Sequence, residues 1–338
     1  MNKLTKIGVS ALCGSLAASL SAHAGDLTVT GGVDMSWISK DDEVTGNPLG
    51  IGSNLTFSGS GELDNGWSVG LTVAHLNANA YSATNVTVGV PGMGDFRISQ
   101  GVSGSGIDRM DDNTPNVWEE AYGTGLGTGI DTVAGASGGA NIEFTPSGTP
   151  DGLTARISFS PSVGGSGSSD KAVSGDDGSV SGAGWDVTLE ASSDMTGVDG
   201  LTVYGGISQI EQAQNAAAYD SDKKEKTVGA KYAMGAWTVG YQMSEEDLGR
   251  ASGATKYEND GYGITFNVND DLSIGYNHYE SEQSNSTNVT AEATSLQIAY
   301  TMGGASIRLA EAEMTNGSYQ TGAAFDRDMT TLSVSLAF

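Results

Sequence analysis

Most of this sequence alternates between apolar and polar residues with a period of two, the pattern of a β-strand with one apolar and one polar face. In residues 27–37, Leu27, Val29, Val33 and Trp37 fall on one face, and threonine, serine and aspartate fall on the other. The pattern recurs along the chain and predicts about sixteen strands. The predicted strands are residues 27–37, 54–63, 67–74, 84–90, 94–101, 139–145, 152–161, 184–192, 201–210, 226–234, 237–246, 258–268, 272–281, 291–301, 305–314 and 329–338.

Short turns and long polar loops alternate between the predicted strands. Asp64-Asn65-Gly66 predicts a tight hairpin turn, because these residues tolerate positive φ, and the connections at 234–236 and 302–304 are equally short. Outer-membrane barrels have short turns at one rim and long loops at the other, so the alternation favours a transmembrane antiparallel β-barrel. The predicted long loops are residues 39–51, 77–83, 102–138, 162–183, 211–225, 247–257, 282–290 and 315–328.

The apolar faces of these strands need a partner that the rest of the chain does not supply. The polar faces carry serine, threonine, glycine, asparagine and scattered charges, which suit a wet lumen rather than a packed core. After residue 24 no apolar run reaches the roughly 18 residues of a spanning helix. A closed barrel is the remaining way to satisfy backbone groups in lipid. Because side chains do not fill a sixteen-stranded barrel, we expect an aqueous channel.

Residues 1–24 have the features of a cleaved export signal. Lys3 and Lys6 precede an apolar stretch, and Ala22-His23-Ala24 forms a cleavage site. We therefore expect residues 25–338 to form one transmembrane barrel domain. Cys13 is the single cysteine and leaves with the signal. The mature chain then has no disulfide, no cysteine nucleophile and no cysteine-based zinc site.

Charge and histidine content exclude two further function classes. The formal net charge of −26 repels nucleic acid, which we exclude as a partner. His75 and His278 are the histidines outside the signal, and by parity both lie on the apolar faces of their strands. A Ser-His-Asp site needs a histidine among polar groups. We therefore expect no enzymatic activity.

Residues 102–138 interrupt the strand pattern. A connection of this length is usually functional or disordered. In a wide barrel, a loop after the fifth strand can fold inward and narrow the pore. The alternative is a flexible external loop. The acidic residues of this loop are candidate pore-constriction residues, and the first three are also candidate calcium ligands through their oxygens. They are Asp108, Asp111, Asp112, Glu119 and Glu120.

Four basic residues stand in mid-strand on polar faces: Arg97, Arg156, Lys231 and Arg308. A charge that faces lipid at the membrane midplane costs about 2–4 kcal/mol, so these side chains must point into the lumen. Opposite an acidic loop they would create a transverse field that filters solutes by charge and size. The alternative is that they are ordinary lumen charges without a common location.

The chain resembles Gram-negative general porins of the alphaproteobacterial type. The resemblance covers the mature chain and rests on its start at residues 24–33 (AGDLTVTGGV), its end at residues 332–338 (LSVSLAF) and the long loop after the fifth strand. It implies a homotrimer in the outer membrane, passive diffusion of ions and small hydrophilic solutes, and a constriction formed by the third external loop. Phe338 resembles the terminal aromatic residue that the barrel-assembly machinery reads.

Two other functions remain as alternatives. A substrate-specific outer-membrane channel would differ only in the constriction. A secreted adhesive surface protein would also be rich in Gly, Ser, Thr and Asp, but it would lack the alternating loop lengths and the terminal Phe338. If the chain is a general channel, the many carboxylates of its loops and lumen should give it a weak preference for cations, since charges inside a narrow pore are poorly screened.

Overall fold

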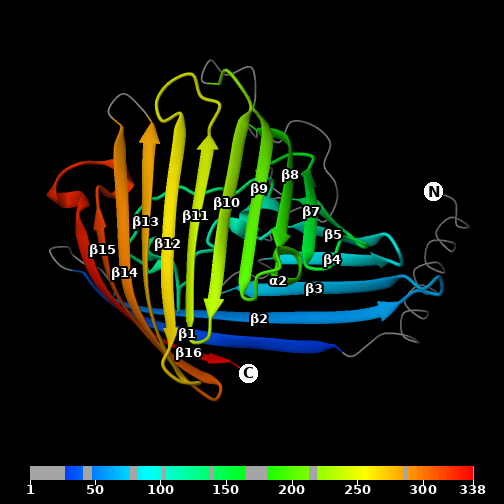
Figure 1. The fold of residues 1–338 in the computed structure, drawn as a ribbon, viewed down its shortest axis with the longest axis horizontal. Helices are drawn as coiled ribbons and strands as arrows, with labels where there is room; N and C mark the ends of the chain where they lie inside the picture. Colours follow the sequence, from blue (N-terminus) through cyan, green and yellow to red (C-terminus); the bar gives the residue numbers. More distant parts are fainter. Residues whose placement is uncertain are drawn as a thin grey trace, which may run out of the picture.

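The computed structural model describes residues 27–40, 48–76, 83–100, 104–137, 140–163, 181–212, 219–284 and 288–337. Within them, sixteen antiparallel strands form one closed barrel, in which each strand pairs with its sequence neighbours and β1 pairs with β16 (Figure 1). The predicted sixteen-stranded antiparallel barrel is therefore confirmed. The strands are β1 Thr28–Lys40, β2 Leu49–Glu62, β3 Ser68–Leu76, β4 Ala83–Val90, β5 Gly94–Gln100, β6 Asn141–Pro146, β7 Leu153–Ser160, β8 Ser181–Ala191, β9 Leu201–Gln212, β10 Lys223–Met234, β11 Trp237–Asp247, β12 Lys256–Asn267, β13 Leu272–Ser284, β14 Val289–Met302, β15 Ala305–Thr315 and β16 Arg327–Ala337.

The register separates the two faces of the sheet as the alternation predicts. Met35 of β1 pairs with Val334 of β16 and Ile51 of β2, so apolar side chains stand beside each other around the outside. Ile51 keeps 69% of its surface exposed, and exposed apolar residues recur on the outer face of nearly every strand. The opposite, inner face carries small and polar residues. An outer surface of this kind is stable only against lipid or another protein.

The outer face changes from apolar to charged along the strands β12 and β13. Tyr262, Tyr276 and His278 form a cluster in which the Tyr262 ring lies 5.0 Å from the His278 ring. One step further along each strand, Asp260 pairs with Glu280. Aromatic rings commonly mark the boundary between the apolar and polar zones of a membrane. The cluster of Tyr262, Tyr276 and His278 is therefore consistent with a membrane boundary at this height of β12 and β13.

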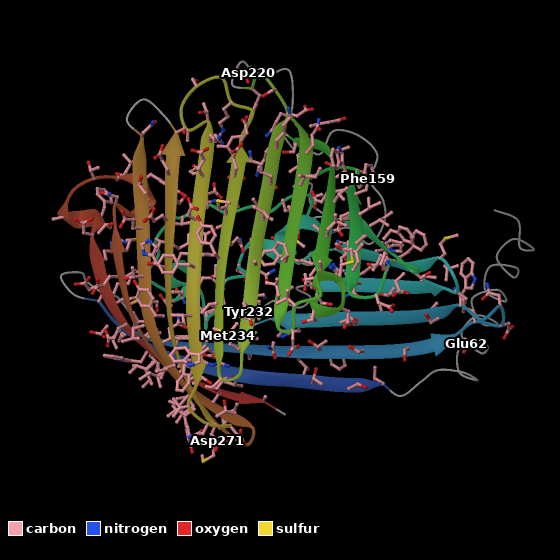
Figure 2. The ribbon with its side chains drawn as sticks, viewed as in Figure 1. Glu62, Phe159, Asp220, Tyr232, Met234 and Asp271 are labelled. Carbon is pink, nitrogen blue, oxygen red and sulfur yellow. The ribbon has the colours of Figure 1, made fainter. Side chains whose placement is uncertain are left out.

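The connections differ at the two rims of the barrel. Figure 2 shows Asp220 at the rim that carries the long loops and Asp271 at the rim of the short turns, at opposite ends of the long strands. The turn rim also holds one short α-helix, α2 Ser193–Thr196, between β8 and β9. Among the described residues, no helix is both long and apolar enough to cross a membrane.

The wall of the barrel is uneven in height. Within the described part of the chain, strands β4 to β7 contain 8, 7, 6 and 8 residues. On the other side, strands β12 to β14 contain 12, 13 and 14 residues. In the low wall, the described outward residues of β5 and β6 include Phe96, Ile98, Ile142 and Phe144, and none is charged. The barrel thus has a low apolar wall and a high wall with a charged upper edge.

Candidate functional site

Residues 104–137, named here the lumen segment, connect β5 to β6 and contact the inner face of the sheet. The segment includes two short helices, η1 Gly106–Met110 and η2 Ala121–Gly123. Ile107, Met110, Leu126 and Val133 have no exposed surface. Leu126 packs with Ile38 of β1 and with Met314 and Met329 of β15 and β16. The segment therefore has a packed core of its own against the barrel wall.

Glycines on the inner face let the segment approach the wall closely. A Cβ atom at Gly263 would lie 2.0 Å from the carbonyl oxygen of Pro115, and one at Gly240 would lie 2.6 Å from Pro115 Cδ. At Gly275 a Cβ would lie 3.2 Å from Val117. Glycine in a strand commonly marks such an approach by another backbone. These three residues of β11, β12 and β13, named here the glycine track, therefore form the surface on which the lumen segment packs.

Two buried glutamines hold the middle of the segment. Gln242 Nε2 of β11 donates to the backbone oxygens of Met110 and Asp111 at 2.8 and 2.9 Å. The side-chain oxygen of Gln297 on β14 accepts from the backbone nitrogen of Trp118 at 3.1 Å, and its Nε2 donates to the oxygen of Glu119 at 2.5 Å. Because an amide both donates and accepts, each glutamine bonds to backbone oxygens and backbone nitrogens of the segment; Gln242 also accepts from Asn113 N at 3.2 Å.

Three inward carboxylates hold the two ends of the segment. Glu143 of β6 accepts from Gly106 N at 2.8 Å. Asp186 of β8 accepts from Ile107 N at 3.3 Å and from Ala136 N at 3.1 Å. On β10, Glu225 accepts from the backbone nitrogen of residue 135 at 2.6 Å. Hydrogen bonds that backbone N–H groups donate to a carboxylate are stronger than those between neutral groups. These bonds therefore fix both ends of the lumen segment against the barrel wall.

The predicted acidic residues lie in unequal environments. Asp112 and Glu119 are exposed, Asp111 is half-buried and Glu120 is 5% exposed. Glu120 accepts a hydrogen bond from the side-chain amide of Asn116. Asp108 accepts from Gly104 N and from the Ser137 hydroxyl, so its carboxylate ties the two ends of the segment together.

Burial perturbs the acidity of this group. Desolvation, reinforced by Asp112, raises the pKa of Glu120 to about 8. Desolvation followed by repulsion from Asp112 also raises the pKa of Asp111, and desolvation is the main cause of the raised pKa of Glu119. Loss of water disfavours the charged form of a carboxyl group. The row of acids is therefore less negative near neutral pH than its composition implies.

The predicted basic residues lie on the inner face but do not form one group. Arg308 lies 3.6 Å from Asp34 and is an electrostatic neighbour of Glu119. Lys231 donates to the side chain of Asn113 at 3.0 Å, so its ammonium group helps to hold the lumen segment against β10.

Arg97 and Arg156 join a separate cluster with Arg109 of the segment itself. Arg109 bonds to Glu143 at 2.6 Å, and Arg97 lies 3.5 Å from the same carboxylate. Arg156 is an electrostatic neighbour of all three groups. The sequence interpretation missed Arg109 and Glu143. Glu143 lies between the outward residues Ile142 and Phe144, so the period-two alternation places it on the inner face. This alternation was the sequence signal for the glutamate.

The sequence also predicts a calcium site, an export signal and a terminal assembly residue. Within the described part of the chain, no group of three or more His, Cys, Asp or Glu side chains gathers as a metal site. Calcium at Asp108, Asp111 and Asp112 therefore gains no geometric support and stays a prediction. The signal at residues 1–24, the first residues of the 102–138 loop and the terminal Phe338 lie outside the described residues.

Comparison with known proteins agrees with the fold. The family model described as Gram-negative porin matches residues 8–320. No curated protein sequence matches the chain significantly. Among solved structures, Salmonella typhi OmpF in complex with daunomycin has a TM-score of 0.69 at 13% identity, covering 92% of this chain and 97% of its own.

Two further solved structures have the same fold. A porin refined at 1.8 Å resolution has a TM-score of 0.64 at 16% identity, covering 93% of this chain and 100% of its own. The trimer form of OmpT from Vibrio cholerae has a TM-score of 0.64 at 10% identity, covering 93% of this chain and 99% of its own. At these identities the likeness shows the fold alone. Because the family model spans nearly the whole chain, the chain belongs to the family of Gram-negative porins.

Proposed function

We propose that this porin forms a water-filled channel in the outer membrane through which ions and small hydrophilic solutes diffuse passively. The observation that carries the proposal is a closed barrel with an apolar exterior whose polar interior receives the lumen segment along one wall. Among the described residues, the segment contacts β1 through Ile38 and β6 through Glu143, so the wall from β2 to β4 borders the passage. Membership of the porin family supports a channel rather than an enzyme.

We infer that the lumen segment is the constriction and that it sets a weak preference for cations. Exposed Asp112 and Glu119 supply negative charge, whereas Arg97 and Arg109 share one carboxylate, Glu143. The basic cluster is thus partly neutralised by Glu143, and burial makes the acidic row less negative at Glu120 and Asp111, so Asp112 and Glu119 are its two exposed carboxylates. Charges in a narrow passage are poorly screened by salt, so these two exposed carboxylates should dominate the selectivity.

The reversal potential across a KCl gradient tests this inference. The wild-type channel should favour K⁺ over Cl⁻, and replacing Asp112→Asn together with Glu119→Gln should move the reversal potential toward zero. Glu311→Gln is the matched control, because Glu311 lies on the outer face and bonds to Thr330. Clear anion selectivity in the wild type, or equal shifts in the test and control variants, would contradict the assignment.

We also propose that the channel assembles as a homotrimer through its low wall. Six to eight residues at about 3.3 Å each and a tilt of about 45° cover roughly 14–19 Å, which is less than the ~25 Å apolar band of such barrels. A second subunit removes this mismatch and covers the uncharged face. One structural neighbour, OmpT, is described as a trimer form.

Export and assembly complete the proposal. Residues 1–24 act as the cleaved signal, and Phe338 is read by the barrel-assembly machinery before β16 closes against β1. Closure matters because an open strand edge in lipid leaves backbone groups without partners.

A further inference from the structure

A cavity of about 640 Å³ opens at the loop rim, between the start of β14 and the connection from β15 to β16. Its lining contains none of the acidic residues between Asp108 and Glu120 of the lumen segment. Its lining includes Asn288, Glu292, Asn316, Gln320, Thr321 and Phe325.

The backbone around this cavity adopts an unusual conformation. Among the described residues, the non-glycine positions with positive φ are Asn288, Asn316, Ser318 and Tyr319, with φ between 42° and 56°. Three of these four residues line the cavity. A left-handed backbone is strained for residues other than glycine and is least expected for a bulky side chain such as tyrosine. Such a conformation persists only where the surroundings enforce it.

Hydrogen bonds hold the strained backbone in place. Asn316 donates from Nδ2 to the backbone oxygen of Thr290 at 2.9 Å, and its backbone nitrogen donates to Asp326 at 3.0 Å. The first of these bonds joins the two walls of the cavity. The shape is therefore set before any ligand arrives, which lowers the entropic cost of binding.

The same backbone is bonded to the lumen segment. The nitrogen of Ser318 donates to the oxygen of Thr128 at 2.7 Å. The hydroxyl of Tyr319 accepts from Asp131 N at 2.9 Å and lies 2.7 Å from the Ser281 hydroxyl. Tyr319 thus lines the cavity and contacts the segment at the same time.

The chemistry of the lining favours a neutral ligand rich in hydroxyl groups. Amides of Asn288, Asn316 and Gln320 and the hydroxyl of Thr321 both donate and accept hydrogen bonds, as adjacent sugar hydroxyls require. Half-buried Phe325 offers an apolar ring for the C–H face of a sugar. The cavity lining contains Glu292 but no basic residue, so an anionic ligand is disfavoured.

We propose that this rim cavity binds a neutral mono- or disaccharide and that binding alters the current through the channel by way of Ser318 and Tyr319. The proposal goes beyond passive diffusion, because the ligand acts from a site at the mouth rather than from the passage.

Planar-bilayer recording of the full-length protein tests the proposal, with glucose and maltose as the probes. The protein must be purified in a detergent without a sugar headgroup, because a glucoside or maltoside would occupy the site. Each sugar is added to one side at a time. We expect a saturable change in current from one side only, and at least a tenfold weaker response in the double variant Gln320→Ala, Thr321→Ala. Ser252→Ala, at an exposed position on another loop, should respond like the wild type.

Calorimetry of the same samples separates binding from coupling. Tyr319→Phe keeps the ring but removes the hydroxyl that contacts Asp131, so we expect it to bind sugar and to lose the change in current. Equal responses from both sides that the double variant leaves intact would place the sugar in the passage and overturn the proposal. No heat of binding and no response to either sugar would also overturn it, while the basal conductance independently reports on channel function.

Discussion

Glu120 and its neighbour Glu119 differ in burial, and this difference gives the channel a pH dependence. Glu119 is exposed, whereas Glu120 is buried beside Asn116 with its pKa raised to about 8. Below that pH the Glu120 carboxyl is neutral, and above it the group becomes negative. The passage should therefore gain negative charge as the pH rises through about 8.

We expect the preference for K⁺ over Cl⁻ to increase between pH 6 and pH 9. One unit charge about 4 Å from a permeating ion in water changes its energy by ~1 kcal/mol, which is a severalfold effect on permeability. Glu120→Gln should reduce this increase, and adding Asp111→Asn should remove most of it, since the pKa of Asp111 is also raised. Reversal potentials at graded pH measure the effect.

Glu62→Gln is the control for the pH experiment, because Glu62 is the last residue of β2, at the rim of the short turns (Figure 2). It should keep the full increase with pH. A flat pH profile in the wild type, or an increase that survives the Glu120 and Asp111 substitutions, would contradict the assignment.

Period-two parity predicts the direction of a side chain in a strand but not in an irregular segment. Arg97 and Arg156 stand beside outward residues, so their place on the inner face was predictable from the sequence. The burial of Glu120 was not predictable, because residues 104–137 have no period. Lys231 shows a second limit: its direction followed from parity, but its bond to Asn113 depends on where the segment lies.

At the scale of elements, the strands other than β5, β6 and β7 extend further toward the loop rim than the sequence predicts. β13 continues to Ser284, three residues past its predicted end at residue 281. Past Tyr276 the outward residues are His278, Glu280 and Glu282, so the apolar alternation stops while the backbone pairing with β12 and β14 continues. The alternation reports the part of a strand that faces lipid, whereas hydrogen bonding sets its full length.

The glycine track offers a signal for the seat of the lumen segment that sequence reasoning overlooked. Gly240, Gly263 and Gly275 all fall on the polar faces of their predicted strands. Glycine at such positions removes a side chain where another backbone approaches. Because polar faces of a wide barrel also carry glycine for other reasons, the pattern becomes specific only once the contacts with Pro115 and Val117 are known.

We expect Gly263→Ala to push the segment away from the wall and lower the single-channel conductance. The new Cβ would lie 2.0 Å from the Pro115 oxygen, so the backbone must move toward the passage. Overpacking of this kind costs about 1–3 kcal/mol, which should also lower the thermal stability of the barrel. Gly59→Ala is the matched control, because no atom lies within 4 Å of its added Cβ. Identical conductance and melting of the two variants would contradict this reading of the track.

At the scale of the whole molecule, the low wall predicts where subunits meet. Light scattering in detergent, corrected for bound detergent, should give a protein mass of three subunits. Ile98→Lys and Ile142→Lys together place charges on the outer face of β5 and β6 and should convert the assembly to single subunits. The same substitutions at Leu296 and Ile298 on the high wall should leave the trimer intact. A wild-type mass of one subunit would contradict the proposed trimer.

The central claim is that the barrel encloses a continuous aqueous passage that the lumen segment narrows. Single-channel recording in a planar bilayer, with neutral polymers of graded size added to both sides, tests it most directly. We expect discrete, ohmic conductance steps that small polymers reduce and that polymers above a sharp size limit leave unchanged. Folded, purified protein that inserts into the bilayer without conductance steps would contradict the claim.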